Sequence, residues 1–228
     1  MKHSGKAQRA AFRLIVASLI LLIAIVGAGL IAKFLGGVVV AFASALLVIW
    51  ILFVLFTLYF FRDPTAKVPE GDHLVVSPAH GTIDQIDETI VREFNGEKYK
   101  RVSIFLNVFN VHVQQSPVTG KVTYLKHTSG QFLNAMNADC ADFNENVLLA
   151  FAPTARPTEQ IGVRLIAGLI ARRIIPWVEV GDVVPKGERI SLVQFGSRAN
   201  LYLPMNYQVR ARMGDKVVGG ETIIAERV

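Results

Sequence analysis

The sequence predicts a transmembrane helical hairpin at the N-terminus, followed by a mainly β domain built from antiparallel sheets. Two observations carry this prediction. Residues 1–61 contain two long runs without a charged residue, and from about Pro69 the pattern changes to short alternating or β-branched runs between turn residues. The composition of the 228 residues, 52% hydrophobic and 18% charged, excludes a disordered, collagenous or disulfide-stapled chain.

The two apolar runs are long enough to cross a bilayer. Leu14 to Ala32 is 19 residues without a charge, and Phe34 to Phe61 is a further 28, with one lysine between them. A bilayer core needs about 20 apolar residues per helix. The Gly36-Gly37 pair suits a tight turn, so residues 14–61 are assigned to two transmembrane helices.

The net charge of +6 is concentrated beside these runs. Residues 1–61 carry five basic residues and no acidic one, whereas residues 62–228 carry 19 basic and 18 acidic residues. Basic residues flank membrane helices on the cytoplasmic side. The pattern therefore predicts that a basic tail, residues 1–13, and the domain of residues 62–228 both lie in the cytoplasm, at the inner membrane of the cell. It does not favour nucleic-acid binding, for which the positive charge would have to lie on the domain itself.

Two other interpretations of the apolar runs compete with the hairpin. A basic start followed by an apolar stretch is also typical of a cleaved secretory signal, but this apolar core is longer than in most signals and a second run follows at once. Two core helices of a soluble protein would leave too much apolar surface to cover. The hairpin is the simpler interpretation.

Cysteine chemistry contributes neither disulfides nor a metal site. Cys140 is the single cysteine and forms no internal disulfide, and no Cys/His cluster has the spacing of a zinc site. The sequence therefore predicts a reducing compartment and no metal centre.

Nine runs after the helices are predicted as strands, with turn signals such as Ser77-Pro78 and Ser116-Pro117 between them. The runs are His73–Val76, Gly81–Ile86, Val102–Leu106, Val111–Gln115, Lys121–Leu125, Gly162–Ile166, Arg189–Val193, Asn200–Leu203 and Tyr207–Arg212. Asn137–Asn146 is interpreted as a short helix or an irregular loop, and Pro153–Pro157 as a surface turn.

A weak internal repeat lies near the C-terminus. Gly181–Glu188 and Gly214–Glu221 share the pattern G-D-x-V-x-x-G-E at a separation of 33 residues. Each copy is expected to form a turn whose glycines adopt backbone angles closed to other residues. Two similar hairpin units resemble the flattened barrels of lipoyl and biotinyl carriers, but no lysine occurs from Glu188 to Met213 as an attachment site. The repeat is therefore interpreted as architectural.

Gly196 and Ser197 lie between the two copies and carry the candidate chemistry. Glycine leaves its carbonyl open to close approach, and the serine hydroxyl follows it directly in the chain. Such a pair can undergo an N-to-O acyl shift to an ester where the backbone is strained and a base or an oxyanion donor is near. Elimination of the ester gives dehydroalanine, which hydrolyses to an N-terminal pyruvoyl group. A strand-edge turn is the alternative interpretation of a lone Gly-Ser pair.

The order and spacing of several motifs resemble the phosphatidylserine decarboxylases, in particular their short membrane-bound form. The resemblance runs over nearly the whole chain and ends on Phe195-Gly196-Ser197, which is similar to the family's Leu-Gly-Ser or Phe-Gly-Ser processing site. The other motifs, in chain order, are Phe60-Phe61-Arg62-Asp63-Pro64, Ser77-Pro78-Ala79-His80-Gly81, Val102–Leu106, Asn110-Val111-His112-Val113, Pro117-Val118-Thr119-Gly120 and Gly168–Ile174.

The resemblance implies a proenzyme that cuts itself between Gly196 and Ser197. The products would be a membrane-bound β chain, residues 1–196, and an α chain of 32 residues, 197–228, which stay together as a heterodimer. Ser197 would become a covalent pyruvoyl cofactor, whose ketone forms a Schiff base with the amine of phosphatidylserine and accepts the electron pair released with CO₂. The implied enzyme is a carboxy-lyase that makes phosphatidylethanolamine at the lipid bilayer, in phospholipid biosynthesis. The sequence leaves the oligomeric state open, a higher oligomer included.

The resemblance also indicates which histidines could act. His112 is the candidate for proton transfer, both to activate Ser197 and to protonate the decarboxylated carbon; a strand histidine bonded to a backbone carbonyl is the alternative. The family usually has aspartate where this chain has His80, and its longer members have a second histidine where this chain has Gln115. Three alternatives stay open: His80 acts as the base, Asp84 takes the orienting role, or self-processing is slow or lost.

Other residues and functions remain in competition. Arg164, Arg172, Arg173 and Arg198 could bind a lipid phosphate, although single arginines on strands are more often solvated or paired with acids. The runner-up function is a non-catalytic, membrane-tethered carrier-like module or a pseudoenzyme of the same family. A serine hydrolase is a third alternative, but the chain lacks a G-x-S-x-G elbow and a third triad member. Three histidines have no motif around them: His3, His73 and His127.

Overall fold

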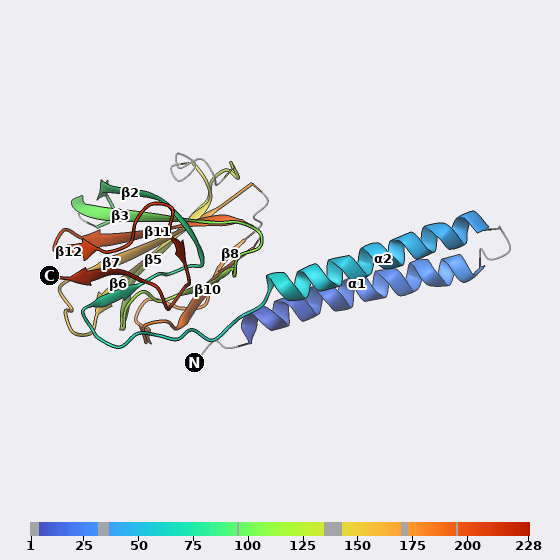
Figure 1. The fold of residues 1–228 in the computed structure, drawn as a ribbon, viewed down its shortest axis with the longest axis horizontal. Helices are drawn as coiled ribbons and strands as arrows, with labels where there is room; N and C mark the ends of the chain where they lie inside the picture. Colours follow the sequence, from blue (N-terminus) through green and yellow to red (C-terminus); the bar gives the residue numbers. More distant parts are fainter. Residues whose placement is uncertain (1–4, 32–36, 95, 135–142, 170–172, 195) are drawn as a thin grey trace. The chain divides into compact units, whose positions relative to one another are not determined.

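The structure is a computed structural model, and it describes residues 5–31, 37–94, 96–134, 143–169, 173–194 and 196–228. The chain divides into two compact units, an N-terminal unit of Gly5–Asp63 and a unit that begins at Pro64 and continues to Val228 (Figure 1).

The first unit is a pair of antiparallel helices, α1 (Lys6–Ile31) and α2 (Gly37–Phe60), which lie side by side. Small residues line their contact, since a Cβ on Gly29 would lie 3.8 Å from that of Ala43. At 1.5 Å per residue, the 24 residues of α2 extend for about 36 Å, compared with a bilayer core of about 30 Å. Both helices are long and apolar enough to cross a membrane, by length and composition.

The predicted pair of long apolar helices is confirmed, with one difference at its start. α1 begins at Lys6, eight residues before the uncharged run, so Lys6, Arg9 and Arg13, which were assigned to the basic tail, are helical. The predicted Gly36-Gly37 turn falls largely outside the described residues, which resume at Gly37. Large apolar side chains around α2 are exposed, such as Val38, Ile49 and Leu55, which suits a lipid environment rather than water.

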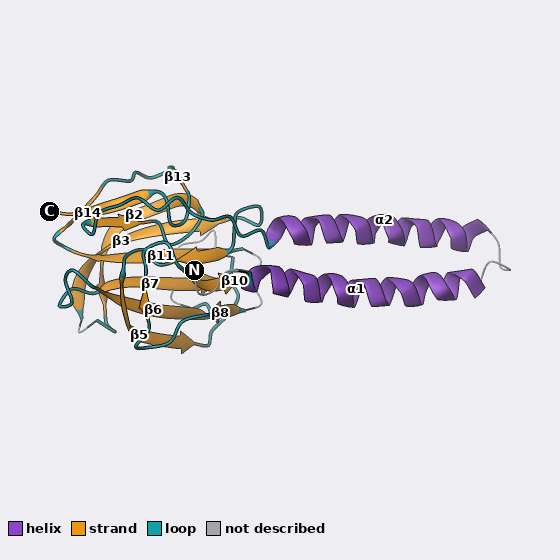
Figure 2. Ribbon diagram, turned by 90° about the horizontal axis from the view of Figure 1, so that it is seen from below, coloured by secondary structure: helices purple, strands orange, loops and turns teal. Residues whose placement is uncertain are grey.

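The second unit is a mainly antiparallel β domain, as predicted. Its strands, in the described residues, form two three-stranded sheets, β1-β14-β12 and β4-β10-β8, and one eight-stranded sheet, β13-β2-β3-β11-β7-β6-β5-β9, which curls into a half-barrel (Figure 2). The bounds are β1 (Leu74–Val76), β2 (Gly81–Val91), β3 (Glu97–Leu106), β4 (Val113–Gln115), β5 (Gly120–Thr128), β6 (Asn146–Pro153), β7 (Ile161–Ala167), β8 (Ile174–Pro176), β9 (Val183–Val184), β10 (Arg189–Val193), β11 (Ser197–Pro204), β12 (Tyr207–Val209), β13 (Lys216–Val217) and β14 (Ile223–Arg227).

All nine predicted runs contain or overlap a strand, but five strands were not predicted: β6, β8, β9, β13 and β14. β6 is buried on both faces, so its side chains show no alternation of apolar and polar types. The other four are only two to five residues long. Pro153–Pro157 is a turn, as expected, with the Arg156 N–H donating to the Pro153 carbonyl at 2.9 Å. Most of Asn137–Asn146 lies outside the described residues, and Asn146 begins β6.

The two copies of the internal repeat form the two edges of the eight-stranded sheet, β9 beside β5 and β13 beside β2. The N–H of Gly187 donates to the Ser116 carbonyl, and that of Gly220 donates to the Ser77 carbonyl, each at 2.8 Å. In each copy, therefore, a glycine N–H donates to the carbonyl of the serine in a Ser-Pro turn. Four of their glycines have positive φ, as expected for such turns: Gly181 (104°), Gly187 (75°), Gly214 (89°) and Gly220 (75°).

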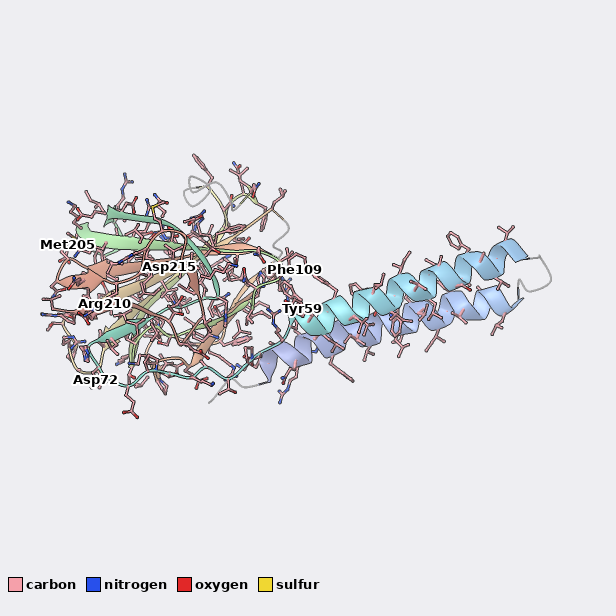
Figure 3. All side chains as sticks on the ribbon, viewed as in Figure 1. Tyr59, Asp72, Phe109, Met205, Arg210 and Asp215 are labelled. Carbon is pink, nitrogen blue, oxygen red and sulfur yellow. The ribbon has the colours of Figure 1, made fainter. Side chains whose placement is uncertain are left out.

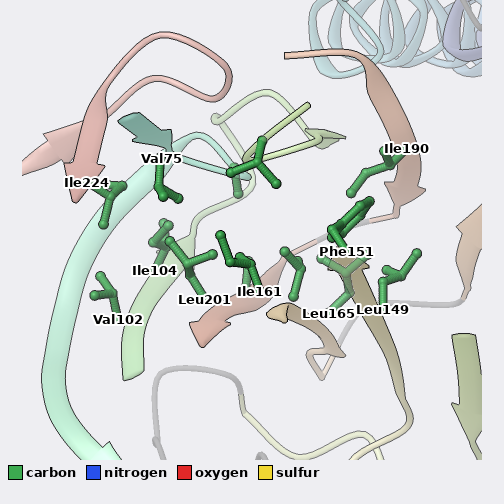
Figure 4. Packing of buried hydrophobic residues seen from close by; sticks show 14 of the residues in the cluster. Val75, Val102, Ile104, Leu149, Phe151, Ile161, Leu165, Ile190, Leu201 and Ile224 are labelled. Carbon is green, nitrogen blue, oxygen red and sulfur yellow. The ribbon is translucent and has the colours of Figure 1, made fainter. Parts of the chain in front are cut away.

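β11 lies in the middle of the large sheet, between β3 and β7. One face of β11 packs into the main core, where Leu201 lies with Ile104 and Leu165 (Figure 4). The opposite face carries Arg198 and Asn200 and is also buried. Polar side chains on such a strand need partners inside the protein, and their partners define the site described next.

Candidate active site

The Gly196-Ser197 peptide lies where the chain enters the central strand of the large sheet. Ser197 is the first residue of β11, and it pairs with Leu106 at the end of β3 and with Ala167 at the end of β7. Gly196 has a φ of 75°, in the left-handed region that favours glycine. Ser197 is 1% exposed. The predicted cleavage pair is therefore buried at one end of the sheet, and Phe195 of the same motif lies outside the described residues.

Two hydrogen bonds fix the backbone of Gly196. Its N–H donates to Nε2 of His112 at 3.0 Å, and its carbonyl oxygen accepts from the N–H of Gly168 at 3.2 Å. That carbonyl belongs to the peptide bond between Gly196 and Ser197. Negative charge that develops on its oxygen during an attack would therefore be stabilised by the Gly168 N–H, as in an oxyanion hole.

The contacts of His112 define which of its ring nitrogens carries the proton. Nδ1 lies 2.9 Å from the Asn110 carbonyl oxygen, which can only accept a hydrogen bond. Nδ1 is therefore protonated, and Nε2 of the neutral ring offers a lone pair, as its bond from the Gly196 N–H also requires. This is the ring state that a general base needs. Nε2 can accept a proton from the Ser197 hydroxyl only after it releases its hydrogen bond from the Gly196 N–H. The two donors belong to adjacent residues, so the exchange is a local one.

The hydroxyl of Ser197 is the unusual feature of the site. It is buried, and within the part of the chain that the structure describes it has no hydrogen-bond partner. Leaving a buried hydroxyl without a partner costs about 1–3 kcal/mol, so native proteins rarely do so without a reason. Conversion of Ser197 to a pyruvoyl group would break no hydrogen bond of its side chain, so the position fits that group.

Arg198, which follows Ser197, forms an ion pair with Asp84 in which the arginine is buried and the carboxylate is partly exposed. Its two terminal nitrogens donate to the two carboxylate oxygens at 2.8 and 2.6 Å, and Arg198 is 1% exposed. Asp84 is the extra residue of a bulge in β2, where the register shifts between Ile83 and Gln85. Such bulges redirect a side chain, here toward the strand that begins at the cleavage pair. The Asp84 carboxylate, one of the three alternatives named above as the group that orients a histidine, is bonded to Arg198.

His80 and Gln115, the two departures from the family pattern, lie next to each other. A Cβ on Gly219 would lie 2.2 Å from Oε1 of Gln115 and 3.1 Å from Cδ2 of His80, so both side chains border that glycine. Oε1 of Gln115 is buried and has no hydrogen-bond partner among the described residues. His80 directly precedes β2, and the register of β2, β3 and β11 puts it at the same end of the sheet as Ser197.

The remaining candidates are spread around the domain. Arg164 is paired with Glu93 at 2.8 Å, Arg173 is exposed, and Arg172 lies outside the described residues. His127 contacts Glu145 at 3.1 Å, and His73 is exposed. His3 and Cys140 are outside the described residues, and within the described ranges no group of three His, Cys, Asp or Glu side chains could hold a metal ion.

Sequence reasoning missed two groups that contact Gly196 and His112, because both are backbone groups. The Gly168 N–H and the Asn110 carbonyl act irrespective of side chain, so residue type gives no signal for them. Both residues belong to motifs already singled out, Gly168–Ile174 and Asn110-Val111-His112-Val113, and the presence of those motifs was the available hint.

Comparison with known proteins gives a consistent result. A family model described as phosphatidylserine decarboxylase matches residues 53–225. A phosphatidylserine decarboxylase proenzyme of Desulfotalea psychrophila is 42% identical over 178 residues, which cover 78% of this chain and 82% of the relative. Proenzymes of the same description from Symbiobacterium thermophilum and Ehrlichia ruminantium are 40% identical over 197 residues and 41% identical over 185 residues. These alignments cover 84% and 81% of this chain, and 91% and 81% of the two relatives.

Proposed function

The chain belongs to the phosphatidylserine decarboxylase family, and we propose that it matures by cutting its own backbone between Gly196 and Ser197. Its reaction is the pyruvoyl-dependent decarboxylation of phosphatidylserine to phosphatidylethanolamine. The observation that carries the cleavage site is the buried Ser197 hydroxyl, which has no hydrogen-bond partner among the described residues and adjoins a carbonyl held by the Gly168 N–H.

The proposed cleavage needs a general base for the serine proton and a hydrogen-bond donor for the oxyanion, and the site has a candidate for each role. Oγ of Ser197 attacks the Gly196 carbonyl carbon while its proton moves to Nε2 of His112, and the Gly168 N–H stabilises the oxyanion. The C–N bond then breaks and the nitrogen of residue 197 takes the proton, which leaves an ester of Gly196 on Oγ. Loss of the Cα proton of residue 197 expels the Gly196 carboxylate and leaves dehydroalanine. Water then replaces the nitrogen, which departs as ammonia.

Strand pairing would keep the two products together. The proposed α chain, residues 197–228, contains β11 to β14, and the proposed β chain, residues 1–196, contains the other strands. β11 is bonded on one side to β3 and on the other to β7, while β13 pairs with β2 and β14 with β1. The cut therefore removes one covalent bond at the end of a strand that is enclosed by the rest of the sheet.

In the mature enzyme the pyruvoyl group at residue 197 supplies an electron sink for the pair released with CO₂. This position lies at a buried end of the sheet, since both Ser197 and His112 are 1% exposed. We assign to Nε2 of His112 the transfer of a proton to the substrate carbon, because it contacts residue 196, one position away. His80 is kept as a second candidate base, beside Gln115.

Mass analysis of the purified full chain tests the cleavage site. We expect two polypeptides, one ending at Gly196 and one beginning at residue 197 with a blocked, ketone-bearing N-terminus that borohydride and substrate trap together. Ser197→Ala should give one uncut chain, whereas Ser129→Ala, at an exposed serine, should be cut normally. A cut chain from Ser197→Ala would refute the site. A single full-length mass for the unaltered chain would favour the pseudoenzyme alternative, and an ordinary serine at the new N-terminus would show that elimination had failed.

The two apolar helices suggest membrane association. We propose that α1 and α2 span the inner membrane with both ends in the cytoplasm, because Lys6, Arg9 and Arg13 lie at the start of α1 and Arg62 follows α2. A green fluorescent protein fused after Val228 should then fluoresce in cells, and alkaline phosphatase at the same point should be inactive. Active alkaline phosphatase there would reverse the orientation.

A further inference from the structure

Five large apolar side chains are exposed on three loops around the cleavage pair, and we call them the apolar rim. A water-soluble surface seldom exposes several such side chains together, and where it does they mark an interaction or membrane surface. The exposed fractions are 62% for Phe109, 37% for Phe132, 41% for Leu133, 58% for Phe143 and 67% for Leu169.

The first of these loops is tied directly to His112 and Gly196. The Phe109 N–H donates to Oδ1 of Asn107, and the Asn110 carbonyl accepts from the His112 ring, both at 2.9 Å. The side chain of Val108 faces Gly196, since a Cβ there would lie 3.9 Å from its Cγ1. Phe109 therefore projects from the same turn that holds the proposed base, at the opposite end of the β domain from Met205 (Figure 3).

The other two loops meet at the end of β7, beside Ser197. Leu169 follows Gly168, whose N–H bonds the scissile carbonyl. Asn144, which is 1% exposed, connects the third loop to the same strand: its Nδ2 donates to the carbonyls of Leu133 and Ala167 at 2.9 and 2.7 Å, and its Oδ1 accepts from the Leu133 N–H at 2.8 Å. Phe132, Leu133 and Phe143 are thus held near the Ala167 that pairs with Ser197.

We propose that the apolar rim inserts into the acyl-chain region of the bilayer and brings the head group of a membrane lipid to residue 197. The proposal rests on the function above, because it takes phosphatidylserine as the substrate. A diacyl lipid whose head group enters a buried site must keep its acyl chains in an apolar environment at the opening of that site. A second copy of this chain or another protein on the rim would close the route by which the lipid enters.

The charge near the rim suits the same partner. Arg173, the first described residue after Leu169, is exposed and basic. Basic residues next to apolar anchors bind the anionic surface of phosphatidylserine-containing leaflets. The rim thus combines apolar side chains with a positive charge, the pairing that interfacial anchors use.

Fluorescent labelling of the full chain in lipid nanodiscs tests the insertion. In a Cys140→Ser background, Phe109→Cys or Leu169→Cys carries an environment-sensitive dye, and lipids with a quencher on the acyl chain are added to the bilayer. The matched control is Ile90→Cys, because Ile90 is 65% exposed and lies at the other end of β2 from the site, about 30 Å from Gly81 at 3.3 Å per residue. We expect strong quenching at residues 109 and 169 and little at residue 90. Equal quenching at the three positions would overturn the proposal.

A substrate comparison gives a second readout. For Phe109→Gln and Leu169→Gln we measure the ratio of turnover on long-chain phosphatidylserine in vesicles to turnover on a short-chain, monomeric phosphatidylserine. Burying one such side chain in an apolar environment changes the partition of the protein between water and membrane by roughly tenfold or more. Each ratio should therefore fall by about tenfold, while Ile90→Gln should leave it unchanged. A ratio that changes less than twofold would contradict insertion. Chain cleavage is measured in every sample, so an uncut chain reports a failure of the proposed maturation, and a cut chain with an unchanged ratio reports a failure of the rim alone.

Discussion

Replacing His112 separates its proposed chemical role from its structural one. In the structure Nε2 accepts the Gly196 N–H, and Nδ1 donates to the Asn110 carbonyl. Alanine removes both the hydrogen bonds and the base. Glutamine offers a carbonyl oxygen that can accept the Gly196 N–H, but it cannot take up a proton near neutral pH.

The expected magnitudes follow from these two roles. Loss of a general base slows a proton-transfer step by about 10²–10⁴, which corresponds to roughly 3–5 kcal/mol in the barrier. Loss of the acceptor leaves a buried N–H unpaired and lowers the free energy of unfolding by about 1–3 kcal/mol. We therefore expect both His112→Ala and His112→Gln to slow self-cleavage by at least about 10², and only His112→Ala to lose substantial stability.

Pulse-labelling and gel separation of the cut and uncut chains give the cleavage rate. Thermal unfolding is measured in the Ser197→Ala background, so that every variant is one continuous chain. His127→Gln is the control, because His127 is an exposed histidine paired with Glu145, and it should change neither quantity. If His112→Gln is cut at a rate within about threefold of the unaltered chain, His112 is not the base and His80 becomes the candidate to test.

Two further predictions concern stability. Asp84→Asn, made in the Ser197→Ala background, removes the carboxylate from the buried guanidinium of Arg198. Leaving a buried charge without its partner costs about 3 kcal/mol, so Tm should fall by roughly 5–10 °C. An unchanged Tm would show that the pair contributes nothing to stability. Burial, together with the hydrogen bond to Glu159, raises the pKa of Tyr207 to about 12. The folded state therefore favours the protonated phenol. The stability that this preference contributes is complete below pH 10 and is lost as the pH rises from 10 to about 12. Tyr207→Phe should abolish that part of the pH dependence of unfolding, roughly 3 kcal/mol for a pKa raised from 10 to about 12. A slope that persists in this variant would assign the pH dependence to another group.

The fold was largely predictable because its signals are local. A run of 28 uncharged residues indicates a long apolar helix whatever it packs against, and alternation in runs such as Arg189–Val193 predicts a strand directly. β6 was missed for the opposite reason. Its residues are almost all apolar because both faces are buried, and that burial is a property of the assembled sheet.

The sequence by itself also determined the candidate cleavage pair, because Gly196-Ser197 are neighbours in the chain and their reaction joins adjacent atoms. What surrounds that pair was decided only by the tertiary structure. His112, Asp84 and Gly168 are separated from it by tens of residues, and they reach it because β11 lies between β3 and β7 at the centre of the sheet. Distances of about 3 Å between such segments decide which His112 nitrogen is protonated, which N–H bonds the Gly196 carbonyl and which carboxylate pairs with Arg198. No local pattern of residue types encodes those distances.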